Sequence, residues 1–353
     1  MSIKHFDCGS ASNGPLAAGC EHCIRGSKMV LFITGRCCTG CFYCPVSLEK
    51  KDRDVIYANE LKISNMEQII EEAEMMDATG TGITGGDPFL NIERTVNAIR
   101  MLKGRFGKEH HIHLYTSTLD PDKVRLVSDA GLDEIRFHPP LIVWNDLSKT
   151  ALREIANMDG IDVGIEVPAL PEHEEDLDAM ITYAHSVGIK FINMNELEFS
   201  ESNWDMMQSQ KYEILGETSS AVRGSRELAM KMIKKHPEIP IHFCASSFKD
   251  SVQLRNRFIR RAKHVSKEYD VITDDGTILK GIIYAENLDE VISVLKEKYD
   301  VPDILFFKDL ERNRLEVASW VLEELANMLP FKCYITEEYP TADRLEVERT
   351  PLN

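Results

Sequence analysis

The sequence predicts an α/β fold, a partial (βα)6 TIM-like barrel followed by a small C-terminal α+β domain. Two observations predict it. Strand-like and helix-like segments alternate from about residue 29 to 247, and polar or reactive side chains recur directly after the strand-like segments. Such alternation is typical of a parallel sheet with crossover helices. Six units fit an incomplete barrel better than a complete eight-fold one.

Apolar runs of strand length mark the predicted strands, and a further run at 239–244 is a candidate seventh strand. The six runs lie at 29–34, 80–84, 111–116, 134–137, 162–167 and 191–195. Apolar residues with helical periodicity lie between them, at 65–76, 91–106, 122–130, 148–158, 173–187 and 219–235. The carboxyl ends of the strands carry the reactive residues, and in βα barrels that end hosts the active site.

The chain divides into three predicted parts. Residues 1–28 form an N-terminal extension with a CxxC pair, residues 29–247 form the barrel, and residues 248–353 form a basic helix plus the small α+β domain. In the last part we predict strands at 269–273, 278–285, near 303–308, 332–338 and 344–348, and helices at 288–299 and 317–329. The turn Asp274-Asp275-Gly276-Thr277 between the first two strands indicates a hairpin.

Net charge, cysteine content and the distribution of apolar residues argue against several classes of protein. The net charge of −17 over 353 residues argues against general affinity for nucleic-acid phosphate. Nine cysteines, an odd number grouped at metal-ligand spacings, indicate thiols and ligands in a reducing compartment, so we expect a cytoplasmic protein. The absence of a signal-peptide pattern and of a long apolar stretch predicts no membrane association.

The most specific pattern is a CxxxCxxC triplet, Cys37, Cys41 and Cys44, directly after the first predicted strand. Three thiolates in one loop can hold three corners of a cubic iron–sulfur cluster. No fourth cysteine follows at comparable spacing, so one iron is left for an outside ligand. The alternatives are a zinc loop or incidental thiols, but zinc sites usually pair two CxxC knuckles.

A glycine pair follows the second predicted strand, in the turn Thr84-Gly85-Gly86-Asp87-Pro88. Two glycines permit close approach of a ligand to the backbone, and the proline then fixes the turn. Alone, this pattern would fit many βα turns. Next to the cysteine triplet it becomes specific.

Together these motifs resemble the hallmarks of the radical S-adenosylmethionine (SAM) superfamily, over about the first 245 residues. The resemblance implies a 4Fe-4S cluster that reductively cleaves SAM to a 5′-deoxyadenosyl radical, which abstracts hydrogen from a small-molecule or peptidyl substrate. It also implies an electron donor of the ferredoxin or flavodoxin type. The sequence departs from the family at Asp87, where a glutamate is usual, which puts only the side-chain role of this residue in doubt.

More narrowly, the chain resembles a group of archaeal proteins described as related to pyruvate formate-lyase activating enzyme. The segments that carry this likeness are Gly19-Cys20-Glu21-His22-Cys23, Gly82-Ile83-Thr84-Gly85-Gly86, Lys108-Glu109-His110-His111-Ile112-His113-Leu114-Tyr115-Thr116 and Glu337-Glu338-Tyr339-Pro340-Thr341.

The resemblance assigns Cys37, Cys41 and Cys44 to the cluster and the Gly85-Gly86 pair to SAM. Other cofactor contacts are expected from placement at strand ends. Tyr43 would stack on adenine, with plain packing as the alternative, and Arg136 would pair with the SAM carboxylate, with a barrel-wall ion pair as the alternative. The remaining candidates are Thr84, Asp87, Thr116, Ser117, Asn193 and Asn195.

A second metal site is one interpretation of Cys20 and Cys23, which precede the first strand, and of His242 and Cys244 on the last. First and last barrel strands approach each other, so these soft ligands would suit zinc or an auxiliary iron–sulfur cluster. The alternative is buried thiols packed as small hydrophobes.

Two further functions stay open beside a radical SAM enzyme acting on a small molecule or peptide. The basic segment 249–267 would let such an enzyme modify RNA, although a solvated helix is the favoured interpretation, since no stacking aromatics accompany it. The third hypothesis is a non-catalytic iron–sulfur or zinc protein.

Overall fold

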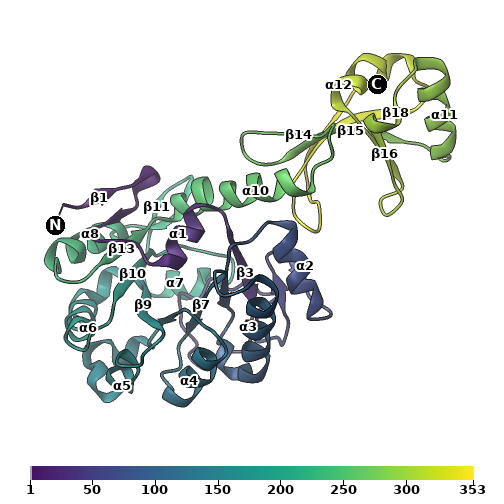
Figure 1. Cartoon of the computed structure of the whole chain (residues 1–353). Coiled ribbons are helices and arrows are strands. Elements are labelled where there is room, and N and C mark those ends of the chain that lie inside the picture. The colour runs from purple at the N-terminus through teal and green to yellow at the C-terminus, as the bar shows by residue number, and fades with distance from the viewer. Residues whose placement is uncertain (1) are drawn as a thin grey trace. The chain divides into compact units, whose positions relative to one another are not determined.

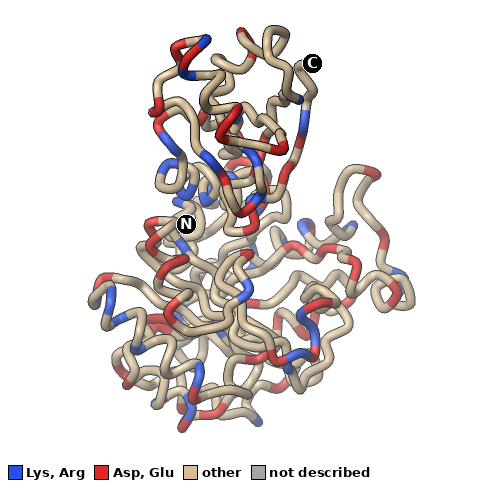
Figure 2. The backbone as a smooth tube through the Cα atoms, turned by 90° about the vertical axis from the view of Figure 1, so that its right-hand side faces the viewer, with Lys and Arg blue, Asp and Glu red and all other residues tan. Residues whose placement is uncertain are grey.

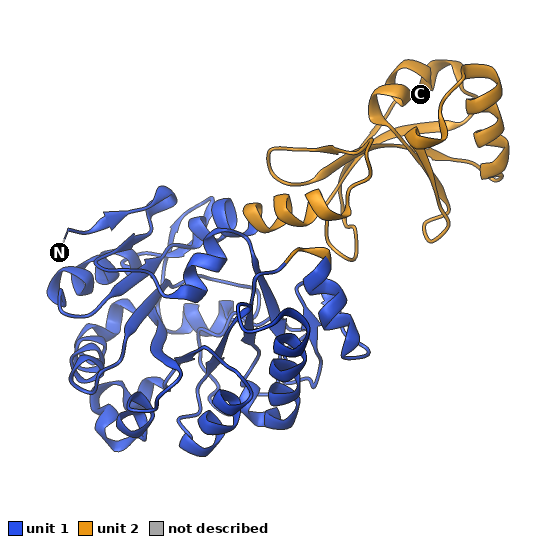
Figure 3. Ribbon diagram, in the orientation of Figure 1, with its two compact units in different colours: residues 1–74, 78–254 blue, residues 75–77, 255–353 orange. Residues whose placement is uncertain are grey.

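The computed structural model describes residues 2–353, which divide into two compact units (Figure 3). The first unit contains the residues up to 74 together with 78–254, and the second contains 75–77 together with 255–353.

Seven parallel strands form the core of the first unit (Figure 1). In spatial order they are β3 (Lys28–Phe32), β6 (Gly80–Thr84), β7 (His111–Thr116), β8 (Glu134–Phe137), β9 (Asp162–Ala169), β10 (Phe191–Glu196) and β13 (Ile241–Cys244). Short antiparallel strands extend both edges: β2 (Ala11–Ser12) and β1 (Lys4–His5) beyond β13, and β4 (Tyr57–Ala58) and β5 (Leu61–Lys62) beyond β3. The sheet is therefore an open, partial barrel of six βα units and a seventh strand, which confirms the predicted fold class.

One helix follows each of the first six parallel strands. These helices are α2 (Glu67–Met75), α3 (Ile92–Phe106), α4 (Pro121–Asp129), α5 (Leu152–Ala156), α6 (Glu174–Ser186) and α8 (Ser225–Lys235). Their buried faces explain their periodicity; in α3, Ala98, Ile99 and Leu102 are fully buried. Helix α4 begins at a cap, because the Asp120 carboxylate accepts hydrogen bonds from the first amides of the helix.

Two predicted helices differ from the structure. Residues 148–158 are not one helix but a 3-10 segment (Leu141–Lys149) followed by α5, because the backbone is extended at Thr150, whose hydroxyl donates to the Leu147 carbonyl at 2.7 Å. The start of 219–235 is a strand instead, β12 (Ser219–Val222), which pairs with β11 (Ile214–Gly216). This unit also contains the short helices α7 (Trp204–Ser209) and α9 (Ser246–Phe248) and a π-helical turn, η5 (Lys249–Leu254).

Helix α1 (Ala18–Ile24) covers the amino ends of the barrel strands. Its His22 stacks on His111 with ring centroids 5.4 Å apart. Its Gly19 amide donates to Glu134 at 3.1 Å, and a Cβ on Gly19 would stand 2.5 Å from the His113 ring. Glycine is thus required here for the helix to reach the barrel interior.

The second unit is a six-stranded antiparallel sheet with three helices. Its strands are β14 (Val271–Ile272), β15 (Ile278–Tyr284), β16 (Phe306–Asp309), β17 (Arg314–Val317), β18 (Lys332–Glu338) and β19 (Glu346–Pro351), and its helices are α10 (Arg255–Val265), α11 (Leu288–Tyr299) and α12 (Ser319–Leu325). An apolar cluster that includes Ile283, Leu295 and Leu322 packs α11 and α12 against one face of the sheet. Strand β17 was absent from the prediction.

Within residues 2–353, we find no helix that combines the length and apolar character required to cross a bilayer.

Buried neutral histidines in the first unit predict acid sensitivity. Burial lowers the pKa of His110 to about 4, and its ring lies 2.8 Å from the Thr81 hydroxyl. The unfolded chain takes up this proton near pH 6.5, so stability is lost as pH falls from there towards 4, by up to about 3 kcal/mol. Urea denaturation across this range should show a smaller loss for His110→Asn than for wild type. Equal losses would contradict the prediction.

Candidate functional site

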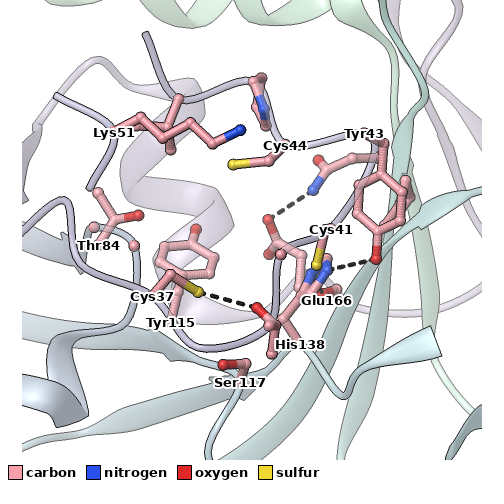
Figure 4. A pocket seen from close by; sticks show the side chains of 18 of the residues that line it. Cys37, Cys41, Tyr43, Cys44, Lys51, Thr84, Tyr115, Ser117, His138 and Glu166 are labelled. Atoms are coloured by element: carbon pink, nitrogen blue, oxygen red, sulfur yellow. Dashed lines mark hydrogen bonds between the residues drawn. The ribbon is translucent and has the colours of Figure 1, made fainter. Parts of the chain in front are cut away.

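The cysteine loop lines a cavity of about 370 Å³ at the carboxyl end of the barrel strands. Figure 4 shows the sulfur atoms of Cys37, Cys41 and Cys44 facing into this cavity. Among residues 2–353, no fourth cysteine lines it. The Asn203 side chain holds the loop in place by donating to the Tyr43 carbonyl at 3.1 Å.

Two opposing effects act on the pKa of the Cys44 thiol in this loop. Burial raises the pKa of the Cys44 thiol, while the nearby ammonium of Lys51 acts to lower it. Lys51 also lines the cavity and lies beside Cys44 in Figure 4. Since iron binds the thiolate, metal uptake here releases protons, and Lys51 favours that deprotonation.

The glycine turn packs flat against the backbone that leads into the cysteine loop. A Cβ on Gly85 would stand 2.5 Å from the Thr34 carbonyl oxygen, and one on Gly86 would stand 2.3 Å from the Arg36 carbonyl oxygen. The Gly86 amide donates to the Thr34 carbonyl at 2.7 Å. Both glycines line the cavity, so they form a cradle that any side chain would disrupt.

The Asp87 carboxylate is buried and anchors this turn to the end of β7. It accepts hydrogen bonds from the hydroxyls of Thr116 at 2.7 Å, Ser117 at 2.7 Å and Thr118 at 2.6 Å, and from the Phe89 amide at 3.0 Å. Thr116 and Ser117 line the cavity, but their hydroxyls are engaged with Asp87. The predicted cofactor contacts of these three side chains stay predictions, and the structure gives them a positioning role.

This anchor yields a test. Replacing Asp87 by Asn removes the charge that holds three hydroxyls, and hydrogen bonds to charged groups are worth about 1.5–3 kcal/mol. We expect SAM affinity to fall by about tenfold while iron and sulfide content stays at the wild-type level. Equilibrium dialysis with labelled SAM measures this. Ser117→Ala, which removes one of the hydrogen bonds, should have a smaller effect; unchanged affinity in Asp87→Asn would contradict the role.

A hydrogen-bonded chain connects the cysteine loop to the barrel wall. The Tyr43 hydroxyl lies 2.9 Å from Nε2 of His138 (Figure 4). Nδ1 of His138 lies 2.9 Å from the main-chain carbonyl oxygen of Glu166. A carbonyl only accepts, so Nδ1 carries the proton and Nε2 accepts from the tyrosine. Burial lowers the pKa of His138, which keeps the ring neutral. This chain orients Tyr43; the predicted adenine stacking stays a prediction.

Arg136 is held in the barrel wall between two acidic side chains. Its guanidinium lies 2.5 Å from Glu134 and 2.7 Å from Glu166. Asn193 and Asn195 donate to the two oxygens of Glu166, each at 2.9 Å. This arrangement matches the ion pair offered as the alternative for Arg136, and it engages both asparagine amides inside the barrel.

The predicted second-site residues do come together, in a polar cavity of about 210 Å³ that we call the inner chamber. Cys20, Cys23, His242 and Cys244 all line it. Gln253 bridges two of the thiols: it accepts from the Cys23 sulfur at 2.9 Å and donates to the Cys244 sulfur at 3.4 Å. Within residues 2–353, no three histidine, cysteine or acidic side chains converge tightly enough to hold one metal ion.

A cubic cluster at Cys37, Cys41 and Cys44 does not require three side chains that converge on one metal ion. Each cysteine of a cubane binds a different iron, so the sulfurs stand apart. Three sulfurs on one cavity, with a glycine cradle beside them, are a donor set that fits a 4Fe-4S cluster and SAM.

Comparison with known proteins decides the family. The radical SAM superfamily model matches residues 31–141, the part that contains the cysteine loop and the glycine turn. A protein of Methanocaldococcus jannaschii named "Putative glycyl-radical enzyme activating enzyme MJ0021" is 40% identical over 351 residues, which span 96% of this chain and 93% of that protein. This chain belongs to the radical SAM superfamily. The likeness seen in the sequence is therefore confirmed, and the chain is an enzyme of unspecified substrate.

Other comparisons add context to this radical SAM enzyme. A family described as a domain of unknown function (DUF8061) matches residues 276–352, in the second unit. Methylornithine synthase (PylB) is 10% identical with a TM-score of 0.39, covering 60% of this chain and 63% of that structure. The methyltransferase TsrM from Kitasatospora setae is 14% identical with a TM-score of 0.36, covering 52% of this chain and 37% of that structure.

Several residues of the site were not among the predicted cofactor contacts. Their shared property is that they line the same cavity as the cysteines: Lys51, Tyr115, His138, Glu166, Glu198 and Lys249. Placement after a predicted strand was the available signal for His138 and Glu166. No local pattern marks Lys51 or Lys249, because only the fold brings them to the cavity.

The basic segment 249–267 is largely engaged with its own chain. Arg260 pairs with Asp77 at 2.5 Å, and Lys249 pairs with Glu198 at 3.1 Å. In the view of Figure 2, acidic and basic residues are interspersed along the backbone. The favoured interpretation of a solvated helix is consistent with this pairing.

Proposed function

We propose that this enzyme generates a 5′-deoxyadenosyl radical in the 370 Å³ cavity and uses it to abstract hydrogen from an organic substrate bound next to that cavity. The observation that carries the proposal is the set of three cysteine sulfurs on one cavity, with no fourth among residues 2–353, beside the glycine cradle. When bound, the cluster supplies one electron to SAM, which yields methionine and the radical. Hydrogen transfer then gives 5′-deoxyadenosine and a substrate radical.

The chain's own residues position and shield this chemistry. Cys37, Cys41 and Cys44 would hold the cluster, and the Gly85-Gly86 backbone would lie against the methionyl part of SAM. The Tyr43–His138 pair would set one wall of the adenosine site. The surrounding barrel would exclude water from a primary radical.

The substrate is an organic molecule or a polypeptide. The name of the M. jannaschii relative supports a protein glycine as one candidate, and a reductant of the ferredoxin or flavodoxin type would supply the electron. RNA is the less supported alternative, since Arg260 of the basic helix is already paired with Asp77. Nine free cysteines support our placement of the enzyme in the cytoplasm.

The test is anaerobic reconstitution, reduction with dithionite, and assay for methionine and 5′-deoxyadenosine. Stoichiometric formation of both is expected. A reconstituted protein that carries a cluster and binds SAM but yields neither product would support the non-catalytic alternative instead.

A further inference from the structure

The inner chamber lies directly beside the radical-generating cavity. Four residues line both: Tyr115, Glu166, Asn195 and Lys249. Two residues of the π-helical turn η5, Lys249 and Gln253, contribute to its wall, and such turns are frequent at functional sites. A molecule in the inner chamber would therefore have one end at the shared wall, next to the cavity proposed for SAM.

Charge in the chamber is unbalanced at one point. Burial raises the pKa of Glu166, but Arg136 and two asparagine amides outweigh it and lower the value to about 2, so this carboxylate is ionised and fully satisfied. Lys249 is paired with Glu198. Lys28 also lines the chamber, and among residues 2–353 no carboxylate pairs with it; its ammonium instead hydrogen-bonds to Cys23, whose thiol donates to Gln253, and lies 6.0 Å from the Tyr115 ring centroid.

Unpartnered polar atoms occur in the same wall. The Asn193 side-chain oxygen and both ring nitrogens of His242 are buried without a hydrogen-bond partner. His242 is only 4% exposed. A buried polar group left without a hydrogen-bond partner destabilises the folded protein. A wall that carries several of them, together with a cation lacking a carboxylate, is that of a site built for a polar ligand.

We propose that the inner chamber is the substrate pocket and that it selects a small organic anion, whose carboxylate contacts Lys28. This inference rests on the proposed function for the role of the ligand as substrate. The 210 Å³ volume suits a small molecule rather than a polypeptide segment. Anion binding supplies the negative charge that Lys28 lacks, and the unpartnered polar atoms of Asn193 and His242 offer hydrogen-bonding groups to the remainder.

A metal ion is the competing occupant. It would have to displace Gln253 from between Cys23 and Cys244, and the four candidate ligands do not converge as arranged. We therefore favour the organic anion and make metal binding an outcome of the test.

Cys23 allows a test that needs no knowledge of the ligand. Its partly exposed thiol lines the chamber, whereas Cys8 is an exposed thiol elsewhere in the unit. Reconstituted enzyme, with its cluster thiols occupied, is treated with iodoacetate, an anion, or with neutral iodoacetamide. Mass spectrometry then gives the ratio of the two alkylation rates at each cysteine. Any effect of Lys28 on the reactivity of the thiol cancels in this ratio.

We expect the iodoacetate preference at Cys23 to exceed that at Cys8 by about 10-fold or more, the size of one charged contact. Lys28→Met should lower the Cys23 ratio to that of Cys8, and Lys28→Arg should retain it. Equal ratios in wild type, or a ratio unchanged in Lys28→Met, would overturn anion selection. Protection of Cys23 from both reagents that a zinc chelator removes would assign the chamber to a metal.

Deuterated iodoacetate tests the substrate role. The tethered S–CD2–COO⁻ group on Cys23 places C–D bonds in the chamber, and reduction in the presence of SAM should yield 5′-deoxyadenosine carrying deuterium. Protein alkylated only at Cys8 should not transfer the label. Unlabelled 5′-deoxyadenosine from the Cys23 adduct would overturn the substrate role, while a lack of any 5′-deoxyadenosine in untreated enzyme would overturn the proposed function instead.

Discussion

Cys41→Ala should abolish SAM cleavage. The Cys41 sulfur faces the same cavity as those of Cys37 and Cys44 (Figure 4), and no fourth cysteine among residues 2–353 lines that cavity to replace it. Partners outside the direct ligands alone are worth 10–100-fold in metal sites, so loss of a direct ligand should lower 5′-deoxyadenosine formation by more than about 100-fold. Iron content and product formation, measured on the same anaerobic preparation, check this.

Cys38→Ala is the matched control. Cys38 lies in the same loop but is exposed, and its side chain is not among those that line the cavity. We expect wild-type iron content and product formation in this variant. If Cys38→Ala and Cys41→Ala lost activity equally, the assignment of the three ligands would be wrong.

Arg136→Met should be the most destabilising single change in the barrel wall. Arg136 is buried and lies within 2.7 Å of both Glu134 and Glu166, which are themselves buried or nearly so. Removing one partner of a buried ion pair costs about 3–5 kcal/mol, because the remaining charge is left uncompensated. Urea denaturation of wild type and variant measures the loss in the free energy of unfolding.

Neutralising the stranded carboxylates gives the control. Arg136→Met combined with Glu134→Gln and Glu166→Gln should recover part of the lost stability, since buried neutral amides need no counter-charge. It also keeps the test decisive if the single variant does not fold. A loss below about 1 kcal/mol in Arg136→Met would show that the ion pairs contribute no more than a surface pair.

Much of the barrel could be predicted because its strands are buried on both faces. The runs at 80–84, 111–116 and 134–137 coincide with β6, β7 and β8. In the second unit, the predicted helix 288–299 and strand 332–338 coincide with α11 and β18. Local apolar periodicity determines such elements, so the sequence alone suffices.

Strand β17 escaped prediction for the opposite reason. Its sequence is Arg314-Leu315-Glu316-Val317, and two charged residues in four predict an exposed segment. In the structure, however, Arg314 and Glu316 are fully buried. They pair with each other at 2.8 Å, and Arg314 pairs with Glu338 at 2.5 Å. Burial of paired charges depends on partners far away in sequence, which no local pattern reveals.

The candidate site likewise contains residues that a local pattern identifies and residues whose role depends on the fold. The spacing of Cys37, Cys41 and Cys44 identified the loop directly, because one loop must supply all three ligands. The role of Asp87 as an anchor and the His138 contact to Tyr43 depend on strand ends meeting in space. A sequence indicates which residues reach that edge of the sheet, but not which of them bind one another.

The charged face of β17 has a consequence for how the second unit assembles. Glu316 lies opposite Ile282 of β15, and Leu315 lies opposite Ile283, so charge and hydrocarbon alternate along the strand. A register shift of β17 by one residue would place Glu316 in the apolar cluster beneath α11 and α12 and would place Leu315 among carboxylates. A wrong register is therefore less stable than the native one, and this short strand determines how the hairpin that contains it pairs with β15.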